Sequence, residues 1–129
     1  MIRNRGAAII VQEGKIALIK RIREEETYYV FPGGGVEEGE TPEEATKREV
    51  YEELGLHIKV EHLIAKVNIK EMNIIMVPIL QAECSEVEQL RNFSGKVEEY
   101  IPMLPINELE KVNIKPYEVV GNIFNHYKI

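Results

Sequence analysis

The chain has 129 residues, enough for one domain with a single hydrophobic core, and 44% hydrophobic with 29% charged residues is an ordinary globular composition. No apolar run approaches the roughly 18–20 residues that cross a bilayer, and the net charge of −6 argues against a basic nucleic-acid surface. We therefore expect neither a membrane nor a nucleic acid as partner. The single cysteine, Cys84, excludes an internal disulfide, and no signal-peptide segment follows the N-terminus, so we expect a cytoplasmic protein.

The first part of the chain predicts three strands. The apolar runs 7–11 and 15–19 flank a glycine-containing turn and predict a β-hairpin. The charged stretch 20–26 is expected to be an exposed strand end and a loop. The aromatic run 28–31 predicts a short strand that stops at Pro32, and the three glycines that follow are expected to form a turn.

A helix is predicted from Pro42 to about Leu54. Thr41 can cap its N-terminus, proline suits the first helical position, and Glu44 completes a capping box. Gly55 is the expected C-terminal stop. The segment therefore carries helix signals at both of its ends.

The second half of the chain predicts three more strands. Residues 57–68 alternate apolar and polar side chains as a half-buried strand does, and 74–81 are nearly all apolar, which favours a central strand. Pro78 disfavours a fully paired position in that strand. Residues 83–99 are polar and irregular, which predicts a long loop, and 100–104 predict a further strand.

The chain is expected to close with an amphipathic helix over residues 116–127. Its apolar stripe consists of Pro116, Val119, Val120, Ile123, Phe124 and Tyr127. The order strand–strand–strand–helix–strands–helix indicates an α+β fold in which a mixed sheet lies between helices.

The net charge is concentrated in one segment. Residues 37–53 contain eight glutamates against two basic residues, whereas the 14 acids and 14 bases elsewhere cancel, and the chain has no aspartate. On a helix Glu49, Glu52 and Glu53 converge on one face, because they are three and four residues apart. One arginine, Arg48, cannot neutralise three carboxylates, so a cation from outside the chain is predicted there.

Residues 34–56 resemble the Nudix box. The fixed positions of that 23-residue pattern are all filled, by Gly34, Glu40, Arg48-Glu49-Val50, Glu52-Glu53 and Gly55-Leu56. The chain is therefore identified as a small MutT-like member of the Nudix hydrolase family, with residues 1–129 as a single domain. The resemblance implies a Nudix fold with the box as loop–helix–loop. It also implies hydrolysis of a nucleoside diphosphate linked to another group, with Mg²⁺ or with Mn²⁺ as a substitute.

The resemblance also implies roles for residues of the box. Glu49, Glu52 and Glu53 look like the metal ligands and catalytic carboxylates, with the backbone carbonyl of Gly34 as a further ligand. Oxygen donors of this kind suit Mg²⁺. Arg48 is expected to orient Glu49 or Glu52, and Glu49 is a candidate general base, a role that family members give to different glutamates.

Two further expectations concern other glutamates. Many relatives take an additional metal ligand from a later loop, and here Glu98 and Glu99 are the candidates, with Glu99 favoured by its spacing to residues 104–109. Glu40 is expected to stabilise its loop by hydrogen bonding and not to bind metal.

Residues outside the box are candidates for substrate binding. Five bases can reach an anionic substrate, namely Arg3, Arg5, Lys20, Arg21 and Arg23, although exposed bases near strand ends are common. Of these we assign Arg5, Arg21 and Arg23 to the substrate. The aromatic side chains of Tyr28, Tyr29 and Phe31 can stack on a base, but packing is favoured for at least two of them.

The substrate remains open at this point. The small size of the chain favours a nucleoside triphosphate, oxidised or not, that is converted to a monophosphate and pyrophosphate. ADP-ribose or another nucleotide sugar is the alternative within the family. A non-catalytic nucleotide-binding module and a structural calcium site are alternatives of another class. Because dimers are frequent among relatives, a homodimer is expected.

Overall fold

Strand β1 organises the sheet of this protein, because three other strands pair with it. The computed structural model describes residues 3–55, 57–69, 75–84 and 99–127. Its elements are β1 (Arg3–Gln12), β2 (Lys15–Arg23), β3 (Glu26–Val30), β4 (Gly33–Gly35), α1 (Pro42–Leu54), β5 (Ile58–Ile69), β6 (Ile75–Cys84), β7 (Glu99–Pro105), the 3₁₀ helices η1 (Ile106–Lys111) and η2 (Tyr117–Val119), and α3 (Val120–Tyr127).

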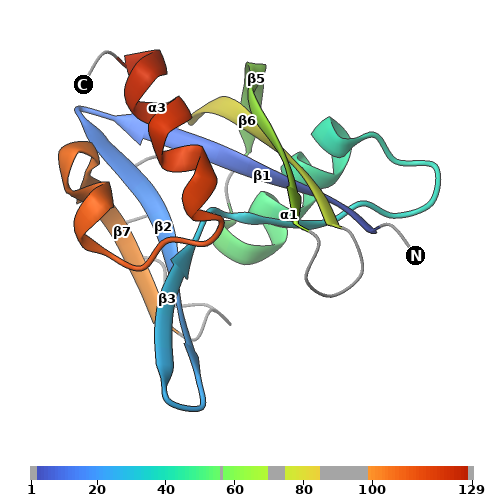
Figure 1. The fold of residues 1–129 in the computed structure, drawn as a ribbon. Coiled ribbons are helices and arrows are strands. Elements are labelled where there is room, and N and C mark those ends of the chain that lie inside the picture. The colour runs from blue at the N-terminus through green and yellow to red at the C-terminus, as the bar shows by residue number, and fades with distance from the viewer. Residues whose placement is uncertain (1–2, 56, 70–74, 85–98, 128–129) are drawn as a thin grey trace.

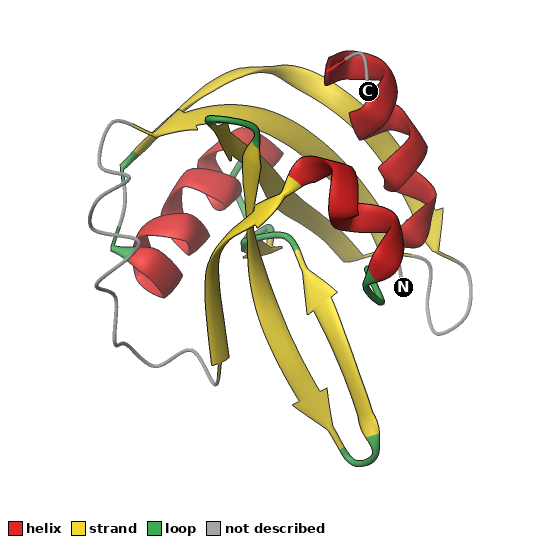
Figure 2. Ribbon diagram, turned by 90° about the vertical axis from the view of Figure 1, so that its left-hand side faces the viewer, coloured by secondary structure: helices red, strands yellow, loops and turns green. Residues whose placement is uncertain are grey.

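The seven strands form one mixed sheet with the order β3-β2-β1-β6-β5 along its main path. β1 runs parallel to β6 and antiparallel to β2 and β4, while β7 pairs with β2. Helices α1 and α3 lie on opposite sides of the sheet (Figures 1 and 2). The predicted α+β fold with a mixed sheet between helices is confirmed. No helix in the described ranges is long and apolar enough to span a bilayer.

The middle of β1 is buried on both faces. Ala7 and Ile9 belong to one hydrophobic cluster with Val119, Val120 and Ile123 from the C-terminal helices. Ala8 and Ile10 are equally buried, and because successive strand residues alternate, they face the opposite side, where α1 packs against β1. This double burial explains why β1 reads as a continuous apolar run.

Gly6 lets helix α1 approach β1 closely. A Cβ at Gly6 would meet Oγ1 of Thr46 and lie 2.6 Å from the carbonyl oxygen of Pro42. Thr46 is fully buried, and its hydroxyl donates to the same Pro42 carbonyl at 2.7 Å. The glycine therefore sets the distance between the first turn of the helix and the central strand.

Helix α1 has the predicted boundaries and caps. The backbone N–H of Glu44 donates to the Thr41 hydroxyl at 3.1 Å, and the Glu44 carboxylate accepts from the backbone N–H of Thr41 at 2.9 Å. Gly55 has a left-handed φ of 69°, and its N–H donates to the Tyr51 carbonyl at 2.8 Å. Both ends of the helix are thus closed by local sequence signals.

Of two predictions in the N-terminal half, one is confirmed and one is wrong. The stretch 20–26 is an exposed strand end and a short loop as predicted, since β2 continues to Arg23, residues 24–25 form a turn and β3 begins at Glu26. The glycines 33–35 form strand β4 and not a turn, since their backbone pairs with β1. Both segments gain backbone hydrogen bonds across the sheet that composition does not reveal.

The strands predicted over 57–68, 74–81 and 100–104 are confirmed as β5, β6 and β7. β6 lies between β1 and β5, with Pro78 opposite Lys66 of β5. Of the loop predicted at 83–99, its first two residues belong to β6 and its last to β7, while 85–98 lie outside the described residues.

The closing helix is shorter than predicted. The segment begins with the 3₁₀ helix η2, and α3 starts only at Val120, because Pro116 is extended and precedes η2. The predicted stripe is otherwise correct. Val119, Val120 and Ile123 are buried, and Phe124 and Tyr127 pack against the core.

Candidate functional site

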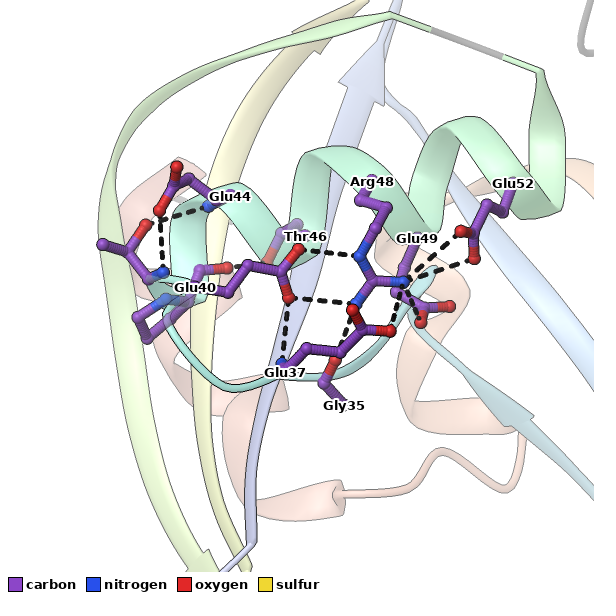
Figure 3. Close-up of polar contacts among 10 residues, drawn as sticks. Gly35, Glu37, Glu40, Glu44, Thr46, Arg48, Glu49 and Glu52 are labelled. Atoms are coloured by element: carbon purple, nitrogen blue, oxygen red, sulfur yellow. Dashed lines mark hydrogen bonds and ion pairs between the residues drawn. The ribbon is translucent and has the colours of Figure 1, made fainter.

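Arg48 is the centre of a polar network that joins α1 to the loop before it (Figure 3). Its Nε and Nη2 donate to the two carboxylate oxygens of Glu40 at 2.7 and 3.0 Å, and Nη2 also donates to the carbonyl of Gly35 at 3.0 Å. Its Nη1 donates to Glu49 at 2.9 Å and to Glu52 at 3.3 Å. One guanidinium therefore contacts two box glutamates while it is anchored to the loop.

Glu40 stabilises the loop in two ways. Besides its paired bonds with Arg48, one of its oxygens accepts from the backbone N–H of Glu37 at 2.9 Å. The hydrogen bonds from Arg48, and next the one from Glu37, lower the pKa of Glu40, and the bonds to Glu40 and Glu49 in turn raise the pKa of Arg48. Two parallel charge-assisted bonds give such a pair a defined geometry.

Gly34 lies directly against the side chain of Glu49. It is buried, and a Cβ placed on it would meet Cδ of Glu49 and lie 2.6 Å from Oε2. This glycine is required by close approach and not by an unusual backbone angle. Any larger residue at position 34 would push the Glu49 carboxylate away from the loop.

The side chain of Glu53 extends from α1 towards Gly33 and Arg21. Its Oε1 accepts a hydrogen bond from the backbone N–H of Gly33 at 2.9 Å, and Nη2 of Arg21 lies 3.4 Å from Oε2. Burial raises the pKa of this carboxyl, opposed by Gly33 and Arg21, while the negative charge of Glu49 raises it further. The charged form of Glu53 is thus less stable in the folded protein than in water.

A cavity of about 520 Å³ adjoins these residues. Its lining contains basic and apolar side chains and no carboxylate, and consists of Arg5, Gly6, Ala7, Arg21, Arg23, Tyr28, Val30, Phe31, Gly33, Gly34, Lys115 and Pro116. Arg21 lines the cavity and also contacts Glu53, so the basic cavity is continuous with the box. The structure places the three arginines assigned to the substrate, Arg5, Arg21 and Arg23, around this one space.

The cavity is also lined by residues that no motif in the sequence marks. Lys115 and Pro116 line it from the C-terminal part of the chain. The ammonium of Lys115 lies 4.4 Å from the centre of the Tyr28 ring and 2.9 Å from Glu26 Oε1. Because these partners lie almost 90 positions earlier in the chain, no spacing in the sequence points to Lys115.

The aromatic residues of β3 and its end divide as expected. Phe31 is buried in the core, and Tyr29 packs against it, so the predicted packing of two of the three aromatics is confirmed. Tyr28 lines the cavity. Phe31 also lines the cavity but is only 5% exposed, so Tyr28 is the more accessible of the two rings for a bound ligand.

The sequence predicts that the carboxylates of the three box glutamates converge. In the structure they have different partners. Glu49 and Glu52 pair with Arg48, while Glu53 accepts from Gly33. Within the described ranges no three side chains of the metal-ligating types lie together as a ligand group. Carboxylates repel one another, and each takes the nearest cation or N–H donor.

The residues nevertheless fit a hard divalent cation. The donors are all carboxylate oxygens, which Mg²⁺ prefers, and the partly buried Glu53 carries a charge that a cation would stabilise. Gly34 lets the Glu49 carboxylate lie directly against the loop backbone. Of the predicted extra ligands, Glu98 lies outside the described residues, and Glu99 is described only as the first residue of β7, paired with Lys20.

Comparisons with known proteins agree on the fold. The family model described as NUDIX domain matches residues 2–122. A NUDIX hydrolase from Nitrosomonas europaea superimposes with a TM-score of 0.77 at 19% identity, covering 99% of this chain and 90% of that one. The E. coli ORF135 protein gives a TM-score of 0.70 at 25% identity, with 92% and 84% covered.

Curated relatives match just under half of the chain. The RNA pyrophosphohydrolase of Vibrio atlanticus is 42% identical over 62 residues, which are 48% of this chain and 35% of that protein. The RNA pyrophosphohydrolase of Aeromonas hydrophila is 45% identical over 53 residues, which are 41% and 29%. The chain thus spans about a third of the length of these relatives.

Proposed function

The chain belongs to the Nudix hydrolase family, as the domain match over residues 2–122 shows, and from this membership we propose that it hydrolyses a pyrophosphate linkage of a nucleoside triphosphate. The products are a nucleoside monophosphate and pyrophosphate. The observation that carries the proposal is the basic cavity that is continuous with the box through Gly33, Gly34 and Arg21.

The charge of the cavity suits a chain of phosphates. None of the residues that line it is acidic, and four of them are cationic, namely Arg5, Arg21, Arg23 and Lys115. Guanidinium groups bind phosphate oxygens in paired, charge-assisted hydrogen bonds. A triphosphate in this space has its phosphorus atoms next to the glycines that border Glu49 and Glu53.

Tyr28 and Pro116 give the cavity an apolar side for a nucleobase. The Tyr28 ring already has a cation on one face, the ammonium of Lys115 at 4.4 Å. Aromatic rings stack on any base, so this contact favours nucleotides without choosing among them. Base preference therefore depends on other groups.

The box residues provide the metal ligands and the proton acceptor for hydrolysis. Mg²⁺ bound by Glu49, Glu52 and Glu53 would neutralise phosphate charge and make a bound water more acidic. Water attacks one phosphorus atom, the P–O bond to the bridging oxygen breaks, and a carboxylate takes the proton of the water. We assign that proton to Glu49. Arg48 positions Glu49 and Glu52, and Gly33 positions Glu53.

A second candidate substrate is the triphosphate at an RNA 5′ end. The curated relatives are RNA pyrophosphohydrolases, and a 5′-terminal nucleotide presents the same triphosphate to the cavity. This candidate departs from our expectation that nucleic acid is excluded. Free ADP-ribose, with two phosphates, would contact fewer of the cationic side chains that line the cavity.

The test is pyrophosphate or phosphate release with Mg²⁺ from a panel of nucleoside triphosphates, oxidised triphosphates, ADP-ribose, dinucleoside polyphosphates and 5′-triphosphorylated RNA. The wild type is compared with Glu53→Gln. We expect turnover of a triphosphate that Glu53→Gln lacks. Tight binding of one compound without turnover of any would support the non-catalytic module, and Ca²⁺ binding without Mg²⁺-supported turnover would support the structural calcium site.

A further inference from the structure

Two histidines that are 64 positions apart meet at the surface. Nε2 of His62 on β5 lies 3.3 Å from Nε2 of His126 on α3, and the ring centres are 4.8 Å apart with an interplanar angle of 52°. Both side chains are exposed to solvent. None of the residues that line the basic cavity belongs to β5 or α3, so this pair is separate from the proposed catalytic site.

We propose that His62 and His126 form a binding site for a borderline divalent cation such as Zn²⁺. Zinc binds imidazole nitrogen at about 2.0–2.1 Å in tetrahedral geometry, which places two such nitrogens about 3.3 Å apart. The observed Nε2–Nε2 separation has this value. A cation between the rings would therefore need no rearrangement of either backbone element.

The backbone around His62 presents its ring at this place. The β5–β6 register shifts between Val60 and His62 and again between Leu63 and Ala65, so β5 bulges on both sides of the histidine. As a result three successive residues, Glu61, His62 and Leu63, are exposed, although a regular strand would alternate. Bulges commonly redirect a side chain in this way.

The position of His126 also favours a cation. It lies in the last turn of α3, where the carbonyl end of the helix stabilises positive charge. Ile123, one turn earlier, is fully buried, which fixes the helix against the sheet and hence the height of His126. The Tyr127 ring stands edge-on at 4.8 Å from the His126 ring and limits its rotation.

The chemistry of the pair selects a different metal from that of the box. Imidazole suits Zn²⁺, Ni²⁺ and Cu²⁺, whereas Mg²⁺ prefers oxygen. Since no third metal-ligating side chain joins the pair in the part of the chain that the structure describes, water fills the remaining positions. Bound metal would connect α3 to β5, and binding weakens in acid because both rings must be neutral.

The first test is thermal unfolding with and without Zn²⁺, using the three histidines of the chain as a matched set. At a free Zn²⁺ concentration tenfold above the dissociation constant, we expect the Tm of the wild type to rise by roughly 4–8 °C. His62→Gln and His126→Gln should each lose this rise, and His57→Gln, an exposed histidine outside the pair, should keep it. A rise that is equal in all four proteins would overturn the proposal.

The second test observes the nitrogens directly. In ¹H–¹⁵N spectra of the histidine side chains, Zn²⁺ should shift Nε2 of His62 and of His126 together, and excess Mg²⁺ should not reverse the shifts. If both resonances respond to pH but not to Zn²⁺, the pair only shares a proton and the proposal is wrong. Glu53→Gln should bind Zn²⁺ at this pair like the wild type, which separates it from zinc bound by the box.

Discussion

The missing side chain of Gly34 leaves the space that the Glu49 carboxylate occupies, since a Cβ there would lie 2.6 Å from Oε2 of Glu49. The atoms that would clash belong to the end of a flexible side chain and not to the backbone. A substitution at this position can therefore be absorbed by moving the carboxylate. The fold survives such a change, but the position of Glu49 does not.

We predict that Gly34→Ala lowers kcat by about 100-fold, because displacing a catalytic group by about 1 Å has effects of this size. The Tm should change little. Gly35→Ala is the matched control, since a Cβ at Gly35 has no neighbour within 4 Å. Steady-state kinetics and thermal unfolding of both variants are the measurements. Equal losses in the two would show that the close approach of Gly34 to Glu49 is not important for turnover.

Glu53→Gln should separate activity from stability. We predict that it lowers kcat by about 10²–10⁴-fold, as expected for a lost catalytic carboxylate. Glu43→Ala, an exposed position whose pair with Lys47 is 4.0 Å long, should change kcat less than about twofold. If both variants lost activity equally, the separation of catalytic from solvent-exposed glutamates would be wrong.

Glu53→Gln should also stabilise the metal-free protein near neutral pH. Burial raises the pKa of Glu53, so the folded state binds this proton more tightly than the unfolded state does. The charged carboxylate therefore destabilises the fold above its folded pKa, and the penalty disappears as the pH falls below the unfolded value of about 4.3. In EDTA at pH 7.5, the Tm of Glu53→Gln should exceed that of the wild type, and the difference should shrink towards pH 4. A lower Tm for the variant would contradict this assignment.

Arg48→Lys should lower kcat although it conserves charge. An ammonium cannot donate two parallel bonds to Glu40 and also reach Glu49 and Gly35, as the guanidinium does. We predict a decrease of at least tenfold in kcat, measured with saturating Mg²⁺. Lys47→Ala, its exposed neighbour, should behave like the wild type.

The arginines of the cavity should differ in which kinetic constant they affect. Arg5→Gln removes a cation that lines the cavity, and we predict a KM about tenfold higher with kcat nearly unchanged. Arg21→Gln should also lower kcat, because Arg21 contacts Glu53. The comparison uses initial rates over a range of triphosphate concentrations. An unchanged KM for both would remove the cavity as the triphosphate site.

The elements with strong local signals could be predicted from sequence. Helix α1 has a complete capping box and a C-terminal glycine, so Thr41 and Gly55 define it without help from the rest of the chain. Strand β4 could not be predicted, because Gly33–Gly35 form a strand only through pairing with β1. The late start of α3 and the 3₁₀ helices likewise depend on local backbone packing that periodicity does not register.

The same distinction applies to the site. The spacing of the box identified Arg48 and its glutamates, because their relation is local to one helix. Lys115 reaches the cavity from a distant segment, and His62 meets His126 only after β5 and α3 pack together. Contacts of this kind depend on tertiary structure and leave no spacing to read. The expected homodimer and cytoplasmic location stay predictions.

Arg48 connects the loop of Gly35, Glu37 and Glu40 to helix α1 by hydrogen bonds and an ion pair, so these contacts hold loop and helix together. The residues that line most of the cavity come instead from β1, β2, β3 and the segment before η2. Altering cavity residues that do not contact the box, unlike Arg21, should therefore leave the contacts of Arg48 undisturbed. Ligand binding can accordingly be altered by substitutions at Arg23, Tyr28 and Lys115 while residues 34–56 are kept unchanged.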